Sequence, residues 1–263
     1  SFDILYYFKI MKKKIKVLQA IPRLGYGGAE TGCYDLAHFL PEQSYKSFIV
    51  TSGGELLKFV DKKKVKVFNL PVQSKNPILI LFNAVIISFI IFIYNINIVH
   101  ARSRATAWSC FLATRFTFRK FVTTFHGTYN FNNKIKKFYN SIMVRSDLVI
   151  AGSNFIFSHI NENYGNFFLK KKRKLLVIFR GINTNYFSPH KILPRKLDKF
   201  SKQNNIDRNK FIILLPGRLT YWKGQKIFIE AIKLLSEKDH IPLFEAIILG
   251  SDQGRNVYKK QLL

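Results

Sequence analysis

Residues 214–225 read LLPGRLTYWKGQ and join the end of a strand, a turn that carries two cations, and the start of a helix. The apolar run at 211–215 predicts a buried strand, which the Pro-Gly pair ends. Arg218 and Lys223 follow, before an amphipathic helical run at 227–235. Because the N-terminus of a helix already attracts phosphate, these two cations predict a pocket for a diphosphate. The alternative is a pair of ordinary surface cations beside a turn.

Short apolar runs alternate with helical runs along the chain. Two of the apolar runs, 175–179 and 211–215, carry no polar residue, as expected for strands that helices cover on both faces. The pattern predicts an α/β fold with two Rossmann-like, doubly wound domains, of which the second is incomplete. The expected strands are 15–20, 47–51, 65–70, 97–100, 121–125, 147–151, 175–179, 211–215 and 244–249, and the expected helices are 29–40, 78–94, 105–116, 134–145, 154–163 and 227–235.

The length of 263 residues is enough for about two domains. We expect the first domain at 11–188, a linker at the polar stretch 189–209, and the start of a second domain at 210–263. A single strand-helix-strand unit is too small to close its own core, so we expect the second domain to be truncated. Residues 1–10 precede Met11 and are interpreted as an extension ahead of the natural start.

The segment 78–94 is apolar except for Asn83, Ser88 and Tyr94. Its length is at the lower end of the range for a membrane-spanning helix. It also occupies the place where a helix must connect the third and fourth expected strands of a parallel sheet. We expect a crossover helix that faces the core or a membrane surface, with a true membrane span as the alternative.

The formal net charge is +28, from 43 basic and 15 acidic residues. Such a surface favours anionic partners, and an anionic membrane surface is one candidate. A solvated, lysine-rich surface without a partner is the alternative. We expect no nucleic-acid partner, because no zinc-finger spacing, basic zipper or RNA-binding aromatic motif accompanies the charge. Cys33 and Cys110 have no metal-binding or redox spacing, and a reduced, cytoplasmic compartment is the simplest setting.

Several polar residues follow directly after expected strands of the first domain. The loop at 25–30 carries three glycines, which let a ligand approach the backbone, but it lacks the third glycine of the dinucleotide fingerprint. Arg102 and Arg104 follow the fourth strand, and His126 follows the fifth. Ligands of open α/β sheets bind outside the carboxyl ends of the strands, so these residues indicate one crevice. For a single histidine at a strand end, a structural role is the alternative.

The sequence shows no Ser/His/Asp set that we can place and no paired carboxylates flanking a cleft. It also lacks an Asp-x-Asp motif that would hold a metal-bound nucleotide. We therefore expect no metal and no other cofactor.

Five short motifs occur in a specific order, and each is weak alone. They are Gly-Gly-Ala-Glu at 27–30, Phe-His-Gly-Thr at 125–128, Gly-Ser-Asn at 152–154, Arg-Gly-Ile-Asn at 180–183 and Gly-Arg…Lys-Gly at 217–224. In this order they resemble the retaining GT-B glycosyltransferases of family 4, which use sugar nucleotides in capsule, lipopolysaccharide and lipid glycosylation. The resemblance covers about residues 14–263.

The resemblance implies roles for individual residues on the donor side. Gly27 and Gly28 would contact the donor diphosphate from the first domain, and Arg218 and Lys223 would hold it from the second, nucleotide-sugar-binding domain. His126 would face the transferred sugar near the reacting carbon. The catalytic candidates are therefore His126, Arg218 and Lys223.

On the acceptor side of the first domain, the candidates are Glu30, Arg102 and Arg104. The family also has a Glu-x7-Glu motif deep in its second domain. Glu237 and Glu245 show that spacing, but they come too early in the domain and Pro242 lies between them. We reject them and expect the true motif beyond residue 263, so the chain as given is expected to be inactive.

The implied reaction is the transfer of a hexosyl unit from a nucleoside-diphosphate sugar to a glycan or lipid-linked acceptor, with retention. It would belong to bacterial cell-surface polysaccharide synthesis, in the cytoplasm or peripherally on the inner face of the cytoplasmic membrane. Two rivals stay open. One is a sugar-nucleotide epimerase of the same shape, which would need carboxylates in the first-domain cleft. The other is a basic protein that binds membranes or nucleic acids.

Overall fold

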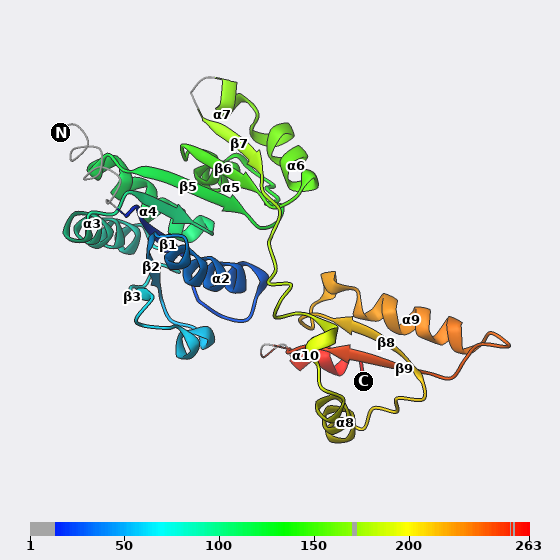
Figure 1. Ribbon diagram of the computed structural model, residues 1–263. Helices are drawn as coiled ribbons and strands as arrows, with labels where there is room; N and C mark the ends of the chain where they lie inside the picture. Colours follow the sequence, from blue (N-terminus) through cyan, green and yellow to red (C-terminus); the bar gives the residue numbers. More distant parts are fainter. Residues whose placement is uncertain (1–13, 170–172, 253, 255) are drawn as a thin grey trace. The chain divides into compact units, whose positions relative to one another are not determined.

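The computed structural model describes residues 14–169, 173–252, 254 and 256–263 (Figure 1). The chain divides into two compact units, Ser1–Gly181 and Ile182–Leu263. The division lies ahead of residue 188, where we expected the first domain to end. Each unit contains its own parallel sheet.

The first unit is built on a seven-stranded sheet whose neighbouring strands are all parallel. The strand order is β3-β2-β1-β4-β5-β6-β7, so the order reverses between β1 and β4. This is the doubly wound arrangement that the sequence predicts. The strands are β1 (Lys16–Ala20), β2 (Lys46–Thr51), β3 (Val65–Asn69), β4 (Ile98–Ala101), β5 (Lys120–Phe125), β6 (Leu148–Ala151) and β7 (Lys174–Val177).

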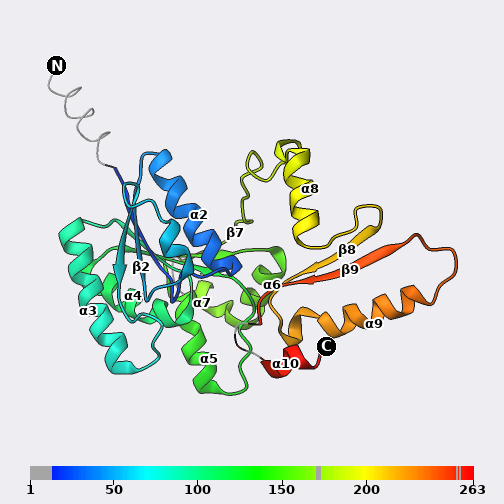
Figure 2. The same ribbon diagram turned by 90° about the horizontal axis from the view of Figure 1, so that it is seen from below.

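The reversal of strand order sends the helices to both faces of the sheet. Crossovers between parallel strands are right-handed, so connections that run in opposite directions along the sheet lie on opposite faces. Figure 2 shows α2 on one side and α3 and α5 on the other. The face of α2 (Gly28–Glu42) also carries the 3-10 helix η1 (Glu55–Phe59). The opposite face carries α3 (Pro77–Tyr94), α4 (Arg104–Thr117), α5 (Lys134–Asn140), the 3-10 helix η2 (Ser141–Val144) and α6 (Asn154–Tyr164), which the short α7 (Asn166–Leu169) follows in the chain.

The alternation of side chains along β2 shows how both faces are filled. Phe48 and Val50 pack into the core that α3 and α4 cover, whereas Ile49 packs into the core beneath α2. Successive residues of a strand point to opposite faces, so a strand covered on both sides must be apolar throughout. This is why apolar residues follow one another without interruption at residues 48–50 of β2.

The structure divides the helix that we expected at 134–145. The α-helix ends at Asn140 and continues as the 3-10 helix η2. At the junction, the Ser141 hydroxyl donates a hydrogen bond to the Phe138 carbonyl at 2.7 Å. Such side-chain bonds compete with the regular helical pattern, which sequence periodicity alone does not reveal.

The segment expected at 78–94 is the crossover helix α3 between β3 and β4. Pro77 occupies its first turn, and the Asn76 side chain accepts a hydrogen bond from the Ile78 amide at 2.9 Å. Asn95 ends the helix in the left-handed conformation, with φ of 49°. By length and composition α3 could also cross a membrane, and only 28% of it is buried in the protein.

The second unit contains two parallel strands with a crossover helix between them, as the sequence predicts. The first of these strands, which we expected to be buried, consists of exposed and half-buried residues. A 3-10 turn links the first strand to the crossover helix, and short helices flank the strands. The elements are the 3-10 helix η3 (Pro189–Lys191), α8 (Pro194–Gln203), β8 (Phe211–Pro216), the 3-10 helix η4 (Tyr221–Lys223), α9 (Gln225–Ser236), β9 (Phe244–Leu249) and α10 (Asn256–Lys260).

The stretch 189–209, which we interpreted as a linker, contains a ten-residue helix, α8. Its proline stands in the first turn, where a missing N–H costs no hydrogen bond. The Arg, Lys, Leu and Gln residues that follow are good helix formers. We read polarity and proline as signs of a linker, but here they belong to an exposed helix.

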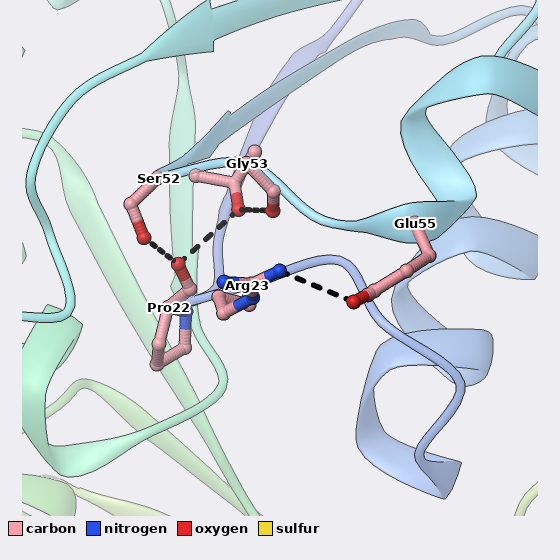
Figure 3. Close-up of polar contacts among 6 residues, drawn as sticks. Pro22, Arg23, Ser52, Gly53 and Glu55 are labelled. Carbon is pink, nitrogen blue, oxygen red and sulfur yellow. Dashed lines mark hydrogen bonds and ion pairs between the residues drawn. The ribbon is translucent and has the colours of Figure 1, made fainter. Parts of the chain in front are cut away.

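The loop after β1 is fixed against the loop after β2. The Leu24 amide donates a hydrogen bond to the Gly53 carbonyl at 2.8 Å. Further polar contacts between the two loops join Pro22 to Ser52 and Arg23 to Glu55 (Figure 3). Gly54 completes the contact, because a Cβ there would lie 2.5 Å from backbone atoms of Leu24. The path of the glycine-rich loop therefore depends on two consecutive glycines after β2.

We predict that Gly54→Ala lowers the free energy of unfolding more than Gly53→Ala does. Both residues have a positive φ, 135° and 112°, so either alanine strains the backbone by about 1–3 kcal/mol. Only at Gly54 would the added methyl group also collide with Leu24, whereas nothing lies within 4 Å at Gly53. Urea unfolding followed by tryptophan fluorescence measures both losses, and equal losses would contradict the packing described here.

Candidate functional site

The carboxyl ends of β1 and β4 lie next to each other, at the point where the strand order reverses. In open α/β sheets this is where ligands bind. The loop after β1 enters α2 through Gly27 and Gly28. Arg102 follows β4, His126 follows β5 and Arg180 lies three residues past β7. The structure thus brings residues from the loops after four strands to one edge of the sheet.

Arg102 is buried at this edge, and its side chain bonds to a neutral amide. Only 8% of it is exposed, and its Nε donates a hydrogen bond to Gln19 Oε1 at 2.9 Å. Gln19 is fixed in turn, because its Nε2 donates to the Cys33 carbonyl at 3.1 Å. No ion pair in the described part of the chain includes Arg102. Burial lowers the pKa of Arg102, and the charge of Arg180 contributes to the decrease.

His126 lies against the second arginine of the cluster. Arg180 Nη2 donates a hydrogen bond to His126 Nδ1 at 2.9 Å. A guanidinium group has no acceptor, so Nδ1 must be the acceptor and the ring proton must be on Nε2. That Nε2 is buried and has no partner among the described residues. His126 therefore offers an N–H group that a ligand oxygen could accept.

The surroundings of His126 keep the ring neutral. Burial lowers its pKa from 6.5 to about 3, and the charges of Arg102 and Arg180 add to this effect. At neutral pH the ring is a hydrogen-bond donor without a positive charge. It is too weak a base to take a proton from a substrate hydroxyl in this state.

Gly27 and Gly28 leave room for the charged side chains around them. A Cβ at Gly28 would lie 2.4 Å from Arg180 Nη1, and a Cβ at Gly27 would lie 2.2 Å from Glu30 Oε2. Glu30 stands in the first turn of α2, where a carboxylate interacts favourably with the helix dipole. A larger residue at either glycine would displace one of these side chains.

Arg104 is engaged with α5 rather than with the arginine cluster. Its Nη1 donates a hydrogen bond to Asn140 Oδ1 at 2.7 Å, and its guanidinium lies 4.3 Å from the centre of the Tyr129 ring. These contacts hold the loop after β5 in place. His100 has a structural role too, because its Nε2 bonds to the Thr124 hydroxyl at 2.7 Å between β4 and β5.

In the second unit, Arg218 and Lys223 stand on the turn between β8 and α9. Both are exposed, and no ion pair between described residues includes either. The turn itself is fixed, because buried Gln225 donates a hydrogen bond from Nε2 to the Arg218 carbonyl at 2.9 Å. Gly224 has a φ of 76°, which lets the chain turn sharply into α9.

The backbones at the ends of β8 and β9 are in close contact beside this turn. The Gly217 amide donates a hydrogen bond to the Leu249 carbonyl at 2.8 Å. A Cβ at Gly250 would lie 1.8 Å from the Gly217 carbonyl oxygen, so a larger residue there must shift the backbone. The alkyl chain of Lys223 lies over Gly217, 3.8–4.0 Å from a Cβ built there. The turn that carries the two cations is therefore rigidly supported.

The sequence identified most of these residues but not their partners. Gly27, Gly28, Glu30, Arg102 and His126 lie together at the edge of the first sheet, as expected. The second unit holds the predicted pair of cations at the end of its own sheet. Sequence reasoning missed Arg180, which we noted only as the start of a short motif after the last strand, and Gln19, an amide within the apolar first strand. In the described residues, no three or more His, Cys, Asp and Glu side chains form a group that could hold a metal ion.

Comparisons with known proteins cover almost the whole chain. The family model described as Glycosyltransferase Family 4 matches residues 26–186, and that described as Glycosyl transferases group 1 matches residues 197–263. No curated protein matches the chain.

Several solved structures are similar. A glycosyltransferase from Rickettsia africae ESF-5 shares 40% sequence identity with a TM-score of 0.79, over 95% of this chain and 64% of that one. Anabaena Alr3699/HepE, solved with UDP and glucose, shares 20% identity with a TM-score of 0.72, over 94% of this chain and 64% of that one. The sucrose-phosphate synthase of Thermosynechococcus elongatus shares 14% identity with a TM-score of 0.69, over 94% of this chain and 66% of that one.

These likenesses confirm the predicted α/β fold class, GT-B, which the resemblance implied. The chain spans 64% of the length of the Rickettsia and Anabaena proteins. One family model covers more than half of the chain, and the Rickettsia protein matches nearly all of it at 40% identity. The chain therefore belongs to glycosyltransferase family 4.

Proposed function

We propose that the whole protein transfers a hexosyl unit from a nucleoside-diphosphate sugar to an acceptor hydroxyl, with retention. One observation carries the proposal: the rigid turn between β8 and α9 presents Arg218 and Lys223 without carboxylate partners among the described residues. Two uncompensated cations beside a helix N-terminus suit a diphosphate better than a neutral ligand.

The second unit would stabilise the leaving group. Negative charge develops on the nucleoside diphosphate as the bond to the sugar breaks. Arg218 and Lys223 would balance that charge, and fixed cations do so without reorganising during the reaction. Because these two side chains supply the charge that a metal ion would otherwise provide, we propose that the reaction needs no metal.

The first unit would orient the sugar and its substituents. The neutral His126 ring presents Nε2–H, which can donate a hydrogen bond to a sugar hydroxyl or a phosphate oxygen. Arg102 and Arg180 give the same edge a positive potential. Gly27 and Gly28 would allow the donor to approach the backbone at the start of α2. Glu30, Arg102 and Arg104 remain the acceptor-side candidates.

The finer features of the proposal come from the family. A front-face substitution would give retention without a carboxylate nucleophile. The Anabaena relative was solved with UDP and with UDP-glucose, which supports a nucleoside-diphosphate hexose as donor. We propose a glycan or lipid-linked acceptor in bacterial cell-surface polysaccharide synthesis, with the protein in the cytoplasm.

The rival activity is sugar-nucleotide epimerisation, which would use carboxylates in the cleft of the first unit. The described loops at the carboxyl edge of the first sheet, with the helical turns they open, carry two carboxylates, Glu30 and Glu55. Glu55 pairs with Arg23 at 3.1 Å, and Glu30 lies against Gly27. This arrangement favours glycosyl transfer.

We predict that Arg218→Ala and Lys223→Ala each lower the transfer rate of the whole protein by about 100-fold or more. Removing one stabiliser of transition-state charge typically has an effect of this size. The measurement is the initial rate of product formation with a saturating nucleoside-diphosphate sugar.

The matched control is Lys233→Ala, which removes an exposed lysine from the last turn of the same helix, α9. Its rate should stay within about twofold of the wild type, since surface substitutions away from a site have small effects. Near-normal rates in both test variants, with the fold intact by circular dichroism, would remove the basis for the diphosphate assignment.

The lowered pKa of His126 predicts how the free energy of unfolding depends on pH. The unfolded chain binds a proton at His126 below about pH 6.5, whereas the folded protein does so only near pH 3. Because only the unfolded chain takes up this proton between about pH 6.5 and pH 3, the free energy of unfolding decreases as the pH falls through this range. His126→Gln removes the titrating group, so the free energy of unfolding of the variant should decline less between pH 7 and pH 4. The difference should reach up to about 3 kcal/mol, and chemical unfolding at each pH would show it. If the free energies of unfolding of the variant and the wild type change with pH in the same way, the His126 ring is not held neutral.

The absence of a metal requirement can be tested by chelation. Product formation should continue unchanged in excess EDTA, because Arg218 and Lys223 provide the charge at the diphosphate. Loss of turnover in EDTA, followed by recovery when magnesium or manganese is added, would show that a metal ion takes part.

A further inference from the structure

The outer surface of α3 is apolar along its whole length. Ile78, Phe82, Val85, Phe89 and Phe92 follow one another at intervals of three or four residues and are all exposed. They form one continuous stripe on the helix. At its end, Phe92 is 82% exposed. The opposite side of the helix is buried against the sheet.

An apolar outer surface is unusual for a helix on the outside of a domain, which normally carries charged residues there. Compositional bias does not explain it. The protein has 43 Lys and Arg residues, but α3 contains none of them and no acidic residue. The helix α2, on the other face of the same sheet, carries Glu30, Asp35 and Glu42. Among the described helices of eight or more residues, α3 is the one without a charged side chain.

The apolar surface continues onto the end of α4. Phe116 and Phe118 are 65% and 94% exposed. The ends of the two helices are joined, because Arg119 Nη2 donates a hydrogen bond to Asn95 Oδ1 at 2.9 Å. We call the five-residue stripe of α3 together with Phe116 and Phe118 the α3 face.

The chain segment that contains α3 is strongly basic, although Lys64 forms an ion pair with Glu42 at 3.2 Å. Residues 62–146 include fourteen Lys and Arg residues and no Asp or Glu. This stretch supplies β3, α3, β4, α4, β5 and α5, so three neighbouring helices on one side of the sheet carry no carboxylate. An apolar stripe within a basic segment is complementary to a surface that is apolar inside and negatively charged outside.

We propose that the α3 face docks on an anionic lipid bilayer, with α3 lying in the interface and not crossing it. A span is incompatible with the fold, because Ile87, Ile90 and Ile91 on the inner side of α3 belong to the main core of the sheet. The aromatic and aliphatic stripe would enter the boundary between headgroups and acyl chains. The flanking cations would contact lipid phosphates. This inference stands apart from the transfer reaction, since its test measures binding and not turnover.

The test uses the whole protein and vesicles of phosphatidylcholine and phosphatidylglycerol in equal amounts, with pure phosphatidylcholine vesicles for comparison. The variant is Phe92→Glu, which places a charge in the α3 face. The matched control is Phe39→Glu, at an exposed phenylalanine of α2 on the opposite face of the sheet. Both sites are exposed, and circular dichroism and thermal melting would check that both variants fold.

Wild-type protein should sediment with the mixed vesicles at low salt and much less with pure phosphatidylcholine. Phe92→Glu should weaken the binding at least about tenfold, because a charge must enter the interface. Phe39→Glu should stay within about twofold. Added salt should weaken the binding by screening the flanking cations, and an alkaline wash without detergent should release the protein.

Four results would overturn the proposal. The first is an absence of wild-type binding to mixed vesicles at low salt. The second is equal binding by Phe92→Glu and the wild type, which would mean that charge alone attracts the protein. The third is binding that survives the alkaline wash, which would mean that α3 is inserted. The fourth is self-association of the wild type in sedimentation velocity that Phe92→Glu abolishes without any vesicle binding, which would make the α3 face a contact between two copies.

Discussion

The reversal of strand order between β1 and β4 is the constraint on which the first unit depends. Since β1 and β4 send their helices to opposite faces, their carboxyl ends are left uncovered between α2 and α4. The loops that follow β1, β4, β5 and β7 bring Gly28, Arg102, His126 and Arg180 to this edge. The same reversal sends α3 to the face opposite α2, so it also determines where the apolar surface of α3 lies.

The chemical feature that both units share is a set of basic side chains that form no ion pair with the described residues. Burying Arg102 is unfavourable, and a neutral amide, Gln19, only partly offsets its desolvation. Arg180 and Arg102 together lower the pKa of His126, so the ring remains a neutral donor. In the second unit, Arg218 and Lys223 project from a turn that Gln225 fixes. An anionic ligand would complete these arrangements, and the strain of holding like charges together favours binding such a ligand.

The fold could be predicted from the sequence because buried strands must be apolar on both faces, and turns with Gly or Pro separate them. The helix α8 was missed because its charged residues and Pro194 are equally compatible with a linker and with an exposed helix. In the site, residue types and strand ends identified His126 and Arg102. Their chemical states could not be predicted, because the tautomer of His126 depends on Arg180, 54 residues later. Likewise, only the fold shows that Arg104 stacks on Tyr129 and bonds to α5.

The central claim is that the cations after β8 recognise a diphosphate group. Titration calorimetry of the whole protein with nucleoside diphosphates and with the corresponding monophosphates tests it most directly. The account predicts that one diphosphate binds at least about tenfold more tightly than its monophosphate, since charge-assisted hydrogen bonds to the second phosphate would be lost. This preference should disappear in Arg218→Ala. Equal affinity for diphosphate and monophosphate across the series, or a preference that Arg218→Ala leaves unchanged, would contradict the account.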